Sequence, residues 1–255
     1  MRYSACIDML FVPESPDPAQ RIRLAKAAGF DAVEFWLWSN KNLDAIEDAL
    51  GETGLTLAGI VAEPFAELTR ITDHQRFFDG LAQSRDVALR LGAKMLIAQG
   101  GPELSGVSRA SQHDALIAAM AGSADVLKGS GLRLGLEPLN TRVDHKGYYL
   151  SSTAEGLGIV NAVNRPEIGL TYDLYHSMVM DEVPQQVVAG HVDRVVHLHI
   201  ADHPGRNQPG TGGLDLAGAV HWLVDNGYEG FAGLEYKPIG DSAASFEQTK
   251  KALGV

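Results

Sequence analysis

Four ionisable side chains stand at the ends of four successive strand-like segments in the second half of the chain. They are Glu137, Asp173, His199 and Glu235. Carboxylates gathered at one place repel one another, and burying each one unpaired costs on the order of several kcal/mol. A divalent cation offsets that cost, and three carboxylates with one imidazole suit Mg²⁺, Mn²⁺ or Co²⁺ better than structural zinc. The competing interpretation is that some of these side chains face solvent or form salt bridges.

The stretch from Val195 to Arg206 shows how a strand delivers such a group. It begins as a β-branched apolar run, typical of a buried strand, and Pro204 and Gly205 then begin a loop. Side chains alternate along a strand, so His197 and His199 share one face and His199 lies at the exit. We therefore expect His199 to reach the site and His197, one layer deeper, to be a core or supporting residue.

Strand-like and helix-like segments alternate along the whole chain. Apolar and β-branched runs predict strands at 4–11, 31–36, 55–62, 94–99, 133–139, 168–173, 195–201 and 231–236. Helical spacing of apolar residues predicts helices at 19–28, 41–52, 73–91, 108–130, 152–163, 184–191, 214–226 and 243–253. Asp73 is the expected N-cap of the third helix.

This order predicts a (β/α)8 barrel, also called a TIM barrel, that occupies residues 1–255 as a single domain. Each strand and its helix take about 30 residues, and about 250 residues are typical of one such barrel. In these barrels the active site lies at the C-terminal ends of the strands, where the four ionisable groups fall. Glu34, Trp36 and Trp38 follow the same logic as candidate pocket walls, although Trp36 is equally a candidate core residue.

Composition narrows the class of protein. The formal net charge of -11 argues against nonspecific binding to nucleic acid or to an anionic membrane surface. No stretch approaches the roughly 20 apolar residues that a membrane span needs, and the N-terminal apolar run is too short for a signal peptide. The one cysteine, Cys6, has no partner for an internal disulfide. We expect a cytoplasmic protein with a small-molecule substrate, and whether it forms a homo-oligomer stays open.

Four stretches together resemble the hydroxypyruvate isomerase family. They are 135–142 (GLEPLNTR), 173–176 (DLYH), 197–212 (HLHIADHPGRNQPGTG) and 233–238 (GLEYKP). The family belongs to the wider xylose-isomerase-like barrel superfamily, which also holds the ketose 3-epimerases, the inosose dehydratases and endonuclease IV. The resemblance covers essentially the whole chain, and its longest specific motifs are the last two. It implies an isomerase of carbohydrate metabolism.

The resemblance also implies roles for single residues. Glu137 and Glu235 correspond to an acid–base pair that also binds the metal, and Asp173 corresponds to a further ligand. The fourth ligand is usually a glutamine in hydroxypyruvate isomerases and a histidine in sugar epimerases, and here it is His199. His176 resembles a histidine that contacts substrate.

The implied reaction interconverts a 2-hydroxyaldehyde and its hydroxyketone isomer by moving one carbon-bound and one oxygen-bound proton. A metal ion can stabilise the enediolate, one glutamate can remove the carbon proton, and the opposite glutamate can return it. Which glutamate does which is left open. Arg206 is a planar donor suited to a substrate carboxylate, with a loop-ordering salt bridge as the equal alternative.

Three functions stay in view. The first is isomerisation of a small hydroxy-keto acid, either hydroxypyruvate or a 2-oxo-tetronate. The second is a ketose 3-epimerase or a related sugar or polyol enzyme, which His199 favours. The third, a DNA-repair endonuclease, needs extra histidines and a basic face, and the acidic composition argues against it. The glycine-rich run 210–213 could bind an anion, but it lacks a phosphate-loop ending and is better interpreted as a turn.

Overall fold

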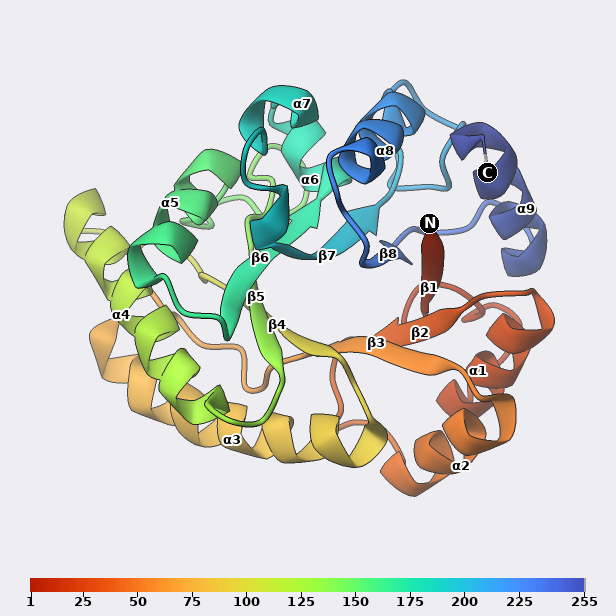
Figure 1. The fold of residues 1–255 in the computed structure, drawn as a ribbon, viewed down its shortest axis with the longest axis horizontal. Coiled ribbons are helices and arrows are strands. Elements are labelled where there is room, and N and C mark those ends of the chain that lie inside the picture. The colour runs from red at the N-terminus through yellow and green to blue at the C-terminus, as the bar shows by residue number, and fades with distance from the viewer. Residues whose placement is uncertain (255) are drawn as a thin grey trace.

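Eight parallel strands close into a barrel in the computed structural model, which describes residues 1–254. Each strand pairs with the next in chain order, and the first pairs with the last, so the sheet has no free edge. The strands are β1 (Arg2–Cys6), β2 (Ala32–Phe35), β3 (Thr56–Val61), β4 (Met95–Gln99), β5 (Arg133–Glu137), β6 (Ile168–Asp173), β7 (Val195–Ile200) and β8 (Phe231–Leu234). Figure 1 looks along the barrel and shows the helices outside the ring of strands. The (β/α)8 barrel predicted from the sequence is confirmed.

The helices pack their apolar faces against the outside of the strands and form the main core with them. They are α1 (Pro18–Ala27), α2 (Leu43–Thr53), α3 (His74–Leu91), α4 (Arg109–Leu127), α5 (Thr153–Val163), α6 (Leu174–Val179), α7 (Pro184–Val187), α8 (Leu216–Asp225) and α9 (Ser242–Leu253). Ser108, Ser152 and Asp241 begin three of them by accepting a hydrogen bond from a first-turn N–H. Among residues 1–254, none of these helices is long and apolar enough to cross a membrane.

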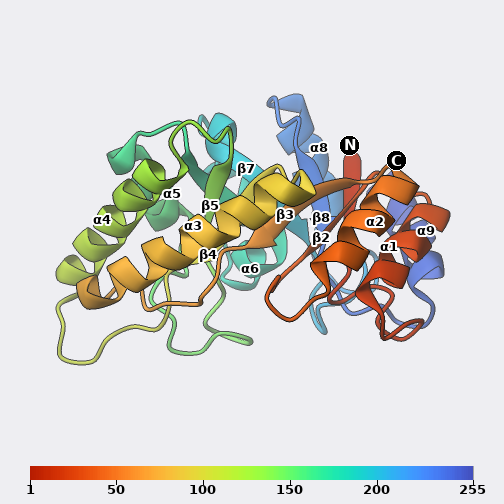
Figure 2. The same ribbon diagram turned by 90° about the horizontal axis from the view of Figure 1, so that it is seen from below.

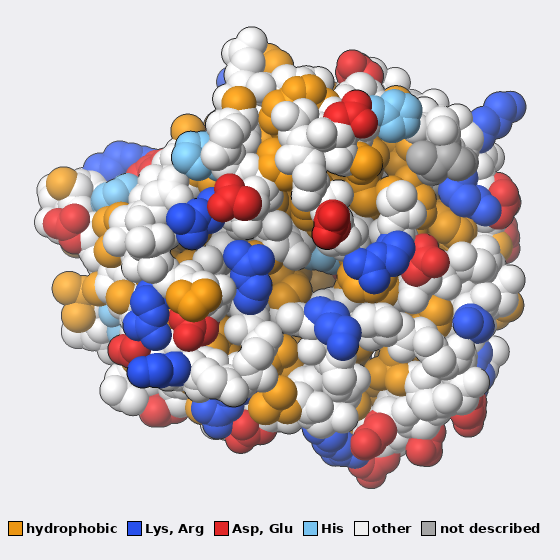
Figure 3. Space-filling view, viewed as in Figure 1, with side chains coloured by type: hydrophobic (Ala, Val, Ile, Leu, Met, Phe, Trp, Pro, Cys, Tyr) orange, Lys and Arg blue, Asp and Glu red, His pale blue; other side chains and the backbone are white. Residues whose placement is uncertain are grey.

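The two ends of the barrel differ. Figure 2 shows both chain termini at one end and the longer loops that follow the strands at the other. At the N-terminal end of the strands, a hollow of about 320 Å³ is lined by Arg2, Lys94 and Arg133, with His197 reaching it from inside the barrel. Figure 3 views this end, where Lys and Arg side chains surround a central hollow. The carboxylates predicted to form the site lie at the opposite end.

Two local predictions from the sequence are wrong near the N-terminal half. β1 ends at Cys6 rather than at residue 11, because the N–H groups of Met9 and Leu10 turn back to the Cys6 carbonyl at 3.0 and 2.8 Å. The apolar run beyond Cys6 is buried as a turn, so its hydrophobicity reflects packing rather than an extended strand. Asp73 precedes α3 within a short 3₁₀ turn, η1 (Ile71–Asp73), and its side chain makes no capping hydrogen bond.

α6 follows β6 without a loop, and the sequence analysis missed it. Asp173 ends β6 and also caps α6, because its carboxylate accepts a hydrogen bond from the His176 N–H at 3.1 Å. The helix predicted at 184–191 is reduced to the single turn α7. A six-residue helix carries too little periodicity to be predicted, yet it is what brings His176 back over Asp173.

The loop between β5 and α5 is anchored by one acidic residue. Glu155 accepts hydrogen bonds from the Tyr149 hydroxyl at 2.7 Å and from the Arg109 guanidinium at 2.6 Å. Burial alone would raise the pKa of Glu155, but the donors Tyr149, Arg109 and His113 hold it below its ordinary value of 4.5. The ionised form therefore stabilises the fold above the unfolded pKa, and that contribution disappears as pH falls through the lower folded pKa.

We expect Glu155→Gln to lower the free energy of unfolding by about 1 kcal/mol at pH 7, because charge-assisted hydrogen bonds become neutral ones. The loss should shrink at pH 4 and below, where the wild-type side chain is itself increasingly protonated. Urea unfolding of both proteins at the two pH values measures this difference. An equal loss at both would show that the charge of Glu155 is irrelevant.

Candidate active site

The structure brings the four sequence-predicted ligand residues together at the C-terminal end of the barrel. Glu137 ends β5, Asp173 ends β6, His199 lies on β7, and Glu235 directly follows β8. All four are buried, and each offers one ligand atom within 4.8 Å of the others. Neighbouring parallel strands end at the same rim, which is why positions far apart in the chain meet here.

His199 lies at the centre of this group. Its Nδ1 is 2.8 Å from Glu137 Oε1, 3.7 Å from Glu235 Oε2 and 4.0 Å from Asp173 Oδ2. Burial alone would lower the pKa of His199, but the carboxylates of Glu235, Glu34 and Glu137 raise it well above its ordinary value. Without a metal ion, the protonated His199 ring therefore offsets part of the repulsion between the buried carboxylates.

The donor set fits a divalent cation. Three carboxylates and an imidazole nitrogen converge from separate strands, and hard divalent ions are bound by such oxygen-rich sets. His199 Nδ1 already faces the three carboxylates, so a cation can replace its proton without a large rearrangement. The buried carboxylate–imidazole cluster predicted from the sequence is therefore present and could hold a metal.

Glu235 is held from two sides. The Trp36 indole N–H donates to Glu235 Oε1 at 2.6 Å, and the Arg206 guanidinium donates to Oε2. Burial raises the pKa of Glu235, but the facing Arg206 and His199 outweigh it and lower the pKa overall. For Asp173 burial is the larger effect, and its pKa is raised. Neighbouring carboxylates at one rim thus have different proton affinities.

His176 presents a neutral N–H to the pocket. The backbone N–H of Asn140 donates to His176 Nδ1 at 3.1 Å, so the ring proton is on Nε2. Burial and the nearby Arg206 lower the pKa of His176 to about 3, which keeps the ring uncharged. Its Nε2 lies 3.5 Å from Asp173 Oδ2 and has no hydrogen-bond partner among the described residues. A substrate oxygen can accept a hydrogen bond from this N–H group.

Arg206 also faces the pocket, and its Nε is buried without a hydrogen-bond partner among residues 1–254. Its backbone is in the left-handed region at φ 53°, a conformation that costs energy in residues other than glycine. The guanidinium lies 5.2 Å above the Tyr175 ring and is also 3.8 Å from Asp173 Oδ2. Both the substrate-binding and the loop-ordering interpretations of Arg206 therefore have a structural basis.

A cavity of about 250 Å³ opens onto three of the four residues, Glu137, His199 and Glu235. Its apolar wall comes from Trp36, Val61, Phe65, Ile97 and Leu139. The cavity also has polar lining residues that the sequence analysis did not single out, namely Gln99, His145 and Tyr148. Two of them belong to the loop after β5, whose polar composition was the available signal. A cavity of this size suits a substrate of a few carbon atoms.

Of the three residues near the end of β2 that were predicted as pocket walls, only one lines the cavity. Trp36 lines the cavity, as the sequence suggested. Trp38 does not, because its indole N–H donates to Ser84 on α3 at 3.0 Å. Glu34 lies inside the barrel against His197 and His199 rather than in the cavity wall.

The glycine-rich run 210–213 forms a turn around an internal carboxylate. Asp202 is buried, and its Oδ2 accepts hydrogen bonds from the N–H groups of Gly210 and Gly212, both at 2.9 Å. The anion at these backbone donors is therefore one of the protein's own side chains.

A closed (β/α)8 barrel with a buried carboxylate–imidazole centre at the C-terminal ends of its strands has the architecture of a barrel enzyme, whose active site lies at that end. The model of the xylose isomerase-like TIM barrel family matches residues 22–253. The chain belongs to that family.

Two relatives that align over nearly the whole chain are isomerases by name, and a solved structure of similar fold has another name. The hydroxypyruvate isomerase of Escherichia coli is 29% identical, over 93% of this chain and 94% of its own length. The 2-oxo-tetronate isomerase of Pectobacterium atrosepticum is 26% identical, over 94% of this chain and 93% of its own. A crystal structure of an AP endonuclease of family 2 from Brucella melitensis is 29% identical and superposes with a TM-score of 0.89, covering 98% of both chains. The predicted resemblance to hydroxypyruvate isomerases is confirmed.

Proposed function

We propose that the protein is a metal-dependent isomerase of a small hydroxy-keto acid, acting on hydroxypyruvate and tartronate semialdehyde or on a 2-oxo-tetronate. The observation that carries the proposal is the pair Glu137 and Glu235, which face one buried centre with Asp173 and His199. The named isomerases from Escherichia coli and Pectobacterium atrosepticum, which align over nearly the whole chain, support the substrate class.

The four residues of the cluster, Glu137, Asp173, His199 and Glu235, would hold a Mg²⁺, Mn²⁺ or Co²⁺ ion. Bound there, the ion polarises the substrate carbonyl and neutralises charge that develops on the substrate oxygens. Asp173 and His199 have the role of ligands alone in this proposal, while the two glutamates also exchange protons.

Glu137 and Glu235 approach the substrate from separate strands, β5 and the end of β8. One removes the proton from the carbon next to the carbonyl, and the other delivers a proton to the neighbouring carbon or oxygen. Glu235 is fixed by Trp36 and Arg206, so its carboxylate cannot swing away while a proton moves. The apolar cavity wall limits water, which would otherwise compete for the substrate's carbon proton.

His176 and Arg206 orient the substrate in this proposal. The Nε2–H of His176 donates to a substrate oxygen, since residues 1–254 give it no acceptor. Arg206 brings a guanidinium into the cavity, and its Nε–H has no partner in the described part of the chain, which suits a substrate carboxylate. In addition to its salt bridge with Glu235, Arg206 would then bind the carboxylate of the substrate.

A ketose 3-epimerase, or a related sugar or polyol enzyme, is the second candidate. His199 favours it, because sugar epimerases of the superfamily carry a histidine at this ligand position where hydroxypyruvate isomerases carry a glutamine. The same pair of glutamates can invert a hydroxyl-bearing carbon by removing a proton on one face and returning it on the other.

Purified protein loaded with Mn²⁺ distinguishes the two candidates when assayed against hydroxypyruvate, a 2-oxo-tetronate and a set of free ketoses. We expect the largest kcat/KM with one of the two hydroxy-keto acids, and a lower value for Arg206→Ala through both a raised KM and a lowered kcat, because Arg206 also holds Glu235. A larger kcat/KM for a ketose than for either acid would replace the first proposal with the second.

A further inference from the structure

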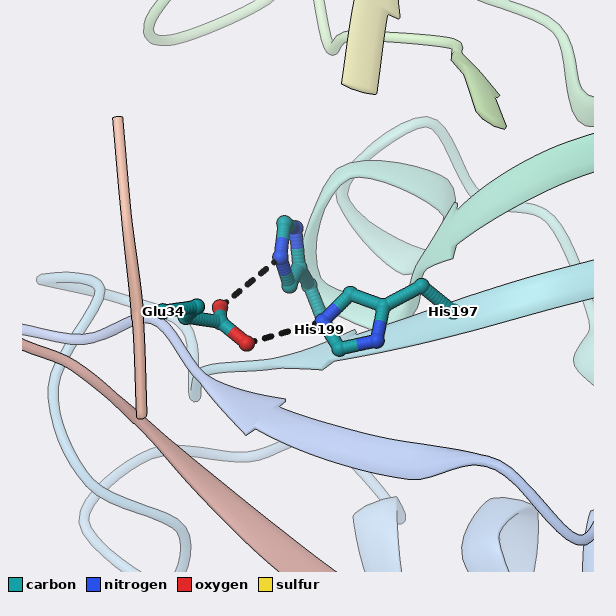
Figure 4. A group of neighbouring side chains, drawn as sticks. All are labelled: Glu34, His197 and His199. Carbon is teal, nitrogen blue, oxygen red and sulfur yellow. Dashed lines mark hydrogen bonds and ion pairs between the residues drawn. The ribbon is translucent and has the colours of Figure 1, made fainter. Parts of the chain in front are cut away.

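A second buried polar cluster lies inside the barrel, on the side of His199 that faces away from the three carboxylates of the candidate metal centre. It consists of Glu34 from β2 and of His197 and His199 from β7, each at most 3% exposed. Figure 4 shows the Glu34 carboxylate facing both rings, with one oxygen directed to each. His197 Nε2 is 2.9 Å from Glu34 Oε2, and His199 Nε2 is 3.0 Å from Glu34 Oε1.

His199 therefore has different partners on its two ring nitrogens. Nδ1 is hydrogen-bonded to Glu137, whereas Nε2 contacts Glu34 at ion-pair distance and has no partner in hydrogen-bonding direction among residues 1–254. The carboxylate of Glu34 is in turn fixed by His197, whose ring stands 4.9 Å from that of His199 and nearly perpendicular to it. Burying a carboxylate inside a barrel is costly unless both oxygens are matched, and here each oxygen faces one imidazole nitrogen.

A glycine beside the cluster leaves room for its side chains. Gly233 on β8 lies beside it, and a Cβ at this position would come within 2.5 Å of Glu34 Oε1 and 2.7 Å of His199 Cδ2. Gly233 is not in the left-handed backbone region, so the conformation alone does not require glycine. The requirement is steric, since Glu34 and His199 occupy the volume of a side chain.

We propose that Glu34 is a positioning residue for the metal centre: it keeps the ring proton of His199 on Nε2 and thereby presents Nδ1 to the metal. This inference rests on the proposed metal-dependent function. Metal-binding histidines generally donate their other N–H to a carboxylate or carbonyl, which fixes the tautomer and the ring orientation and makes the ligand more basic. His197 completes the arrangement by holding Glu34 in place.

Glu34 lies outside the sequence motifs that predicted the metal ligands. It lies 163 positions from His197 and touches neither the cavity nor the three carboxylates of the candidate centre. Its effect must therefore pass through His199. Loss of such a carboxylate typically lowers metal affinity by about 10–100-fold while leaving the direct ligands intact.

Calorimetric titration with Mn²⁺, without substrate, tests the role directly. We expect Glu34→Gln to weaken Mn²⁺ binding by about 10–100-fold. Glu63→Gln is the matched control, because Glu63 accepts hydrogen bonds from the Trp38 N–H and from Ser39 near the end of β3, outside the cluster. Its affinity should stay at the wild-type value. If Glu34→Gln does not fold, Glu34→Asp replaces it in the test. Glu34→Asp keeps the buried charge but has a shorter side chain, so its carboxylate moves away from His199 and Mn²⁺ binding should again weaken.

A double-mutant cycle separates positioning from general stability. In a His199→Gln background the position keeps a side chain that can bind the metal but has no ring to position, so adding Glu34→Gln should cause no further loss of Mn²⁺ affinity. The visible absorption of the Co²⁺-loaded protein gives a second readout, which should change in Glu34→Gln and stay unchanged in Glu63→Gln.

Three results would overturn the inference. Folded Glu34→Gln with wild-type Mn²⁺ affinity would remove the positioning role and leave the proposed isomerase intact. Two bound ions per chain, with the second lost in His197→Ala, would make Glu34 and His197 ligands themselves. A wild-type protein that binds neither Mn²⁺ nor Co²⁺ yet turns over substrate would end both the inference and the metal-dependent function.

Discussion

Glu137→Gln and Glu235→Gln are each expected to lower kcat by about 10²–10⁴-fold or more, with the barrel still folded. The amide keeps the shape of the side chain, and at position 235 it can still accept the hydrogen bond from the Trp36 indole, but it cannot exchange a proton. Both variants also lose one anionic ligand, so the bound metal must be quantified and saturated before the rates are compared. Steady-state rates with hydroxypyruvate at saturating Mn²⁺, together with circular dichroism, measure the effect.

The roles of the two glutamates separate in deuterated water. A variant that still exchanges the carbon proton but forms no product has lost the residue that reprotonates, and one that does neither has lost the base. The double variant should be little slower than either single one, because both groups serve the same proton transfer. Near-normal turnover in both single variants would make Glu137 and Glu235 structural ligands and end the isomerase proposal.

Removing the metal is expected to have the second large effect, abolishing turnover and lowering the unfolding temperature. A ligand at 100 times its Kd adds about 2.7 kcal/mol of stability to the folded state. For a chain of this size that corresponds to roughly 5–11 °C in Tm. Thermal unfolding with a chelator and then with increasing Mn²⁺ measures the shift, and metal analysis gives the bound ion per chain.

His199→Ala and Asp173→Asn should lose both the Tm shift and the bound metal, since each removes a donor from the cluster. Glu63→Gln, which lies outside the cluster, should keep both. Undiminished metal content in the two site variants would show that the ligands have been assigned wrongly.

The strand ends could be predicted from sequence because periodicity and loop signals locate where a strand stops. Glu137 and Asp173 end β5 and β6 as expected, and closure of the barrel then brings them to one rim. The bounds were less reliable where apolar residues are buried without being extended. The stretch after Cys6 is the example, since hydrophobicity records burial and does not distinguish a turn from a strand.

Contacts between distant side chains could not be predicted. Asn140 fixes the tautomer of His176 from 36 positions away, and Glu34 reaches His197 across the barrel interior. Both depend on the register of neighbouring strands and on which way each side chain leaves its strand. A one-residue change of register would reverse those directions, and no local pattern in the chain specifies it.

The turn around Asp202 bears on which substrates suit the proposed function. Many barrels of this type seat a phosphate ester on backbone N–H groups after the seventh and eighth strands. Here the N–H groups of Gly210 and Gly212 are already bound to a buried carboxylate, so an incoming phosphate would find a fixed negative charge in place of free donors. The turn therefore offers no free donors for a phosphate, which agrees with the unphosphorylated hydroxy-keto acids of the proposed function.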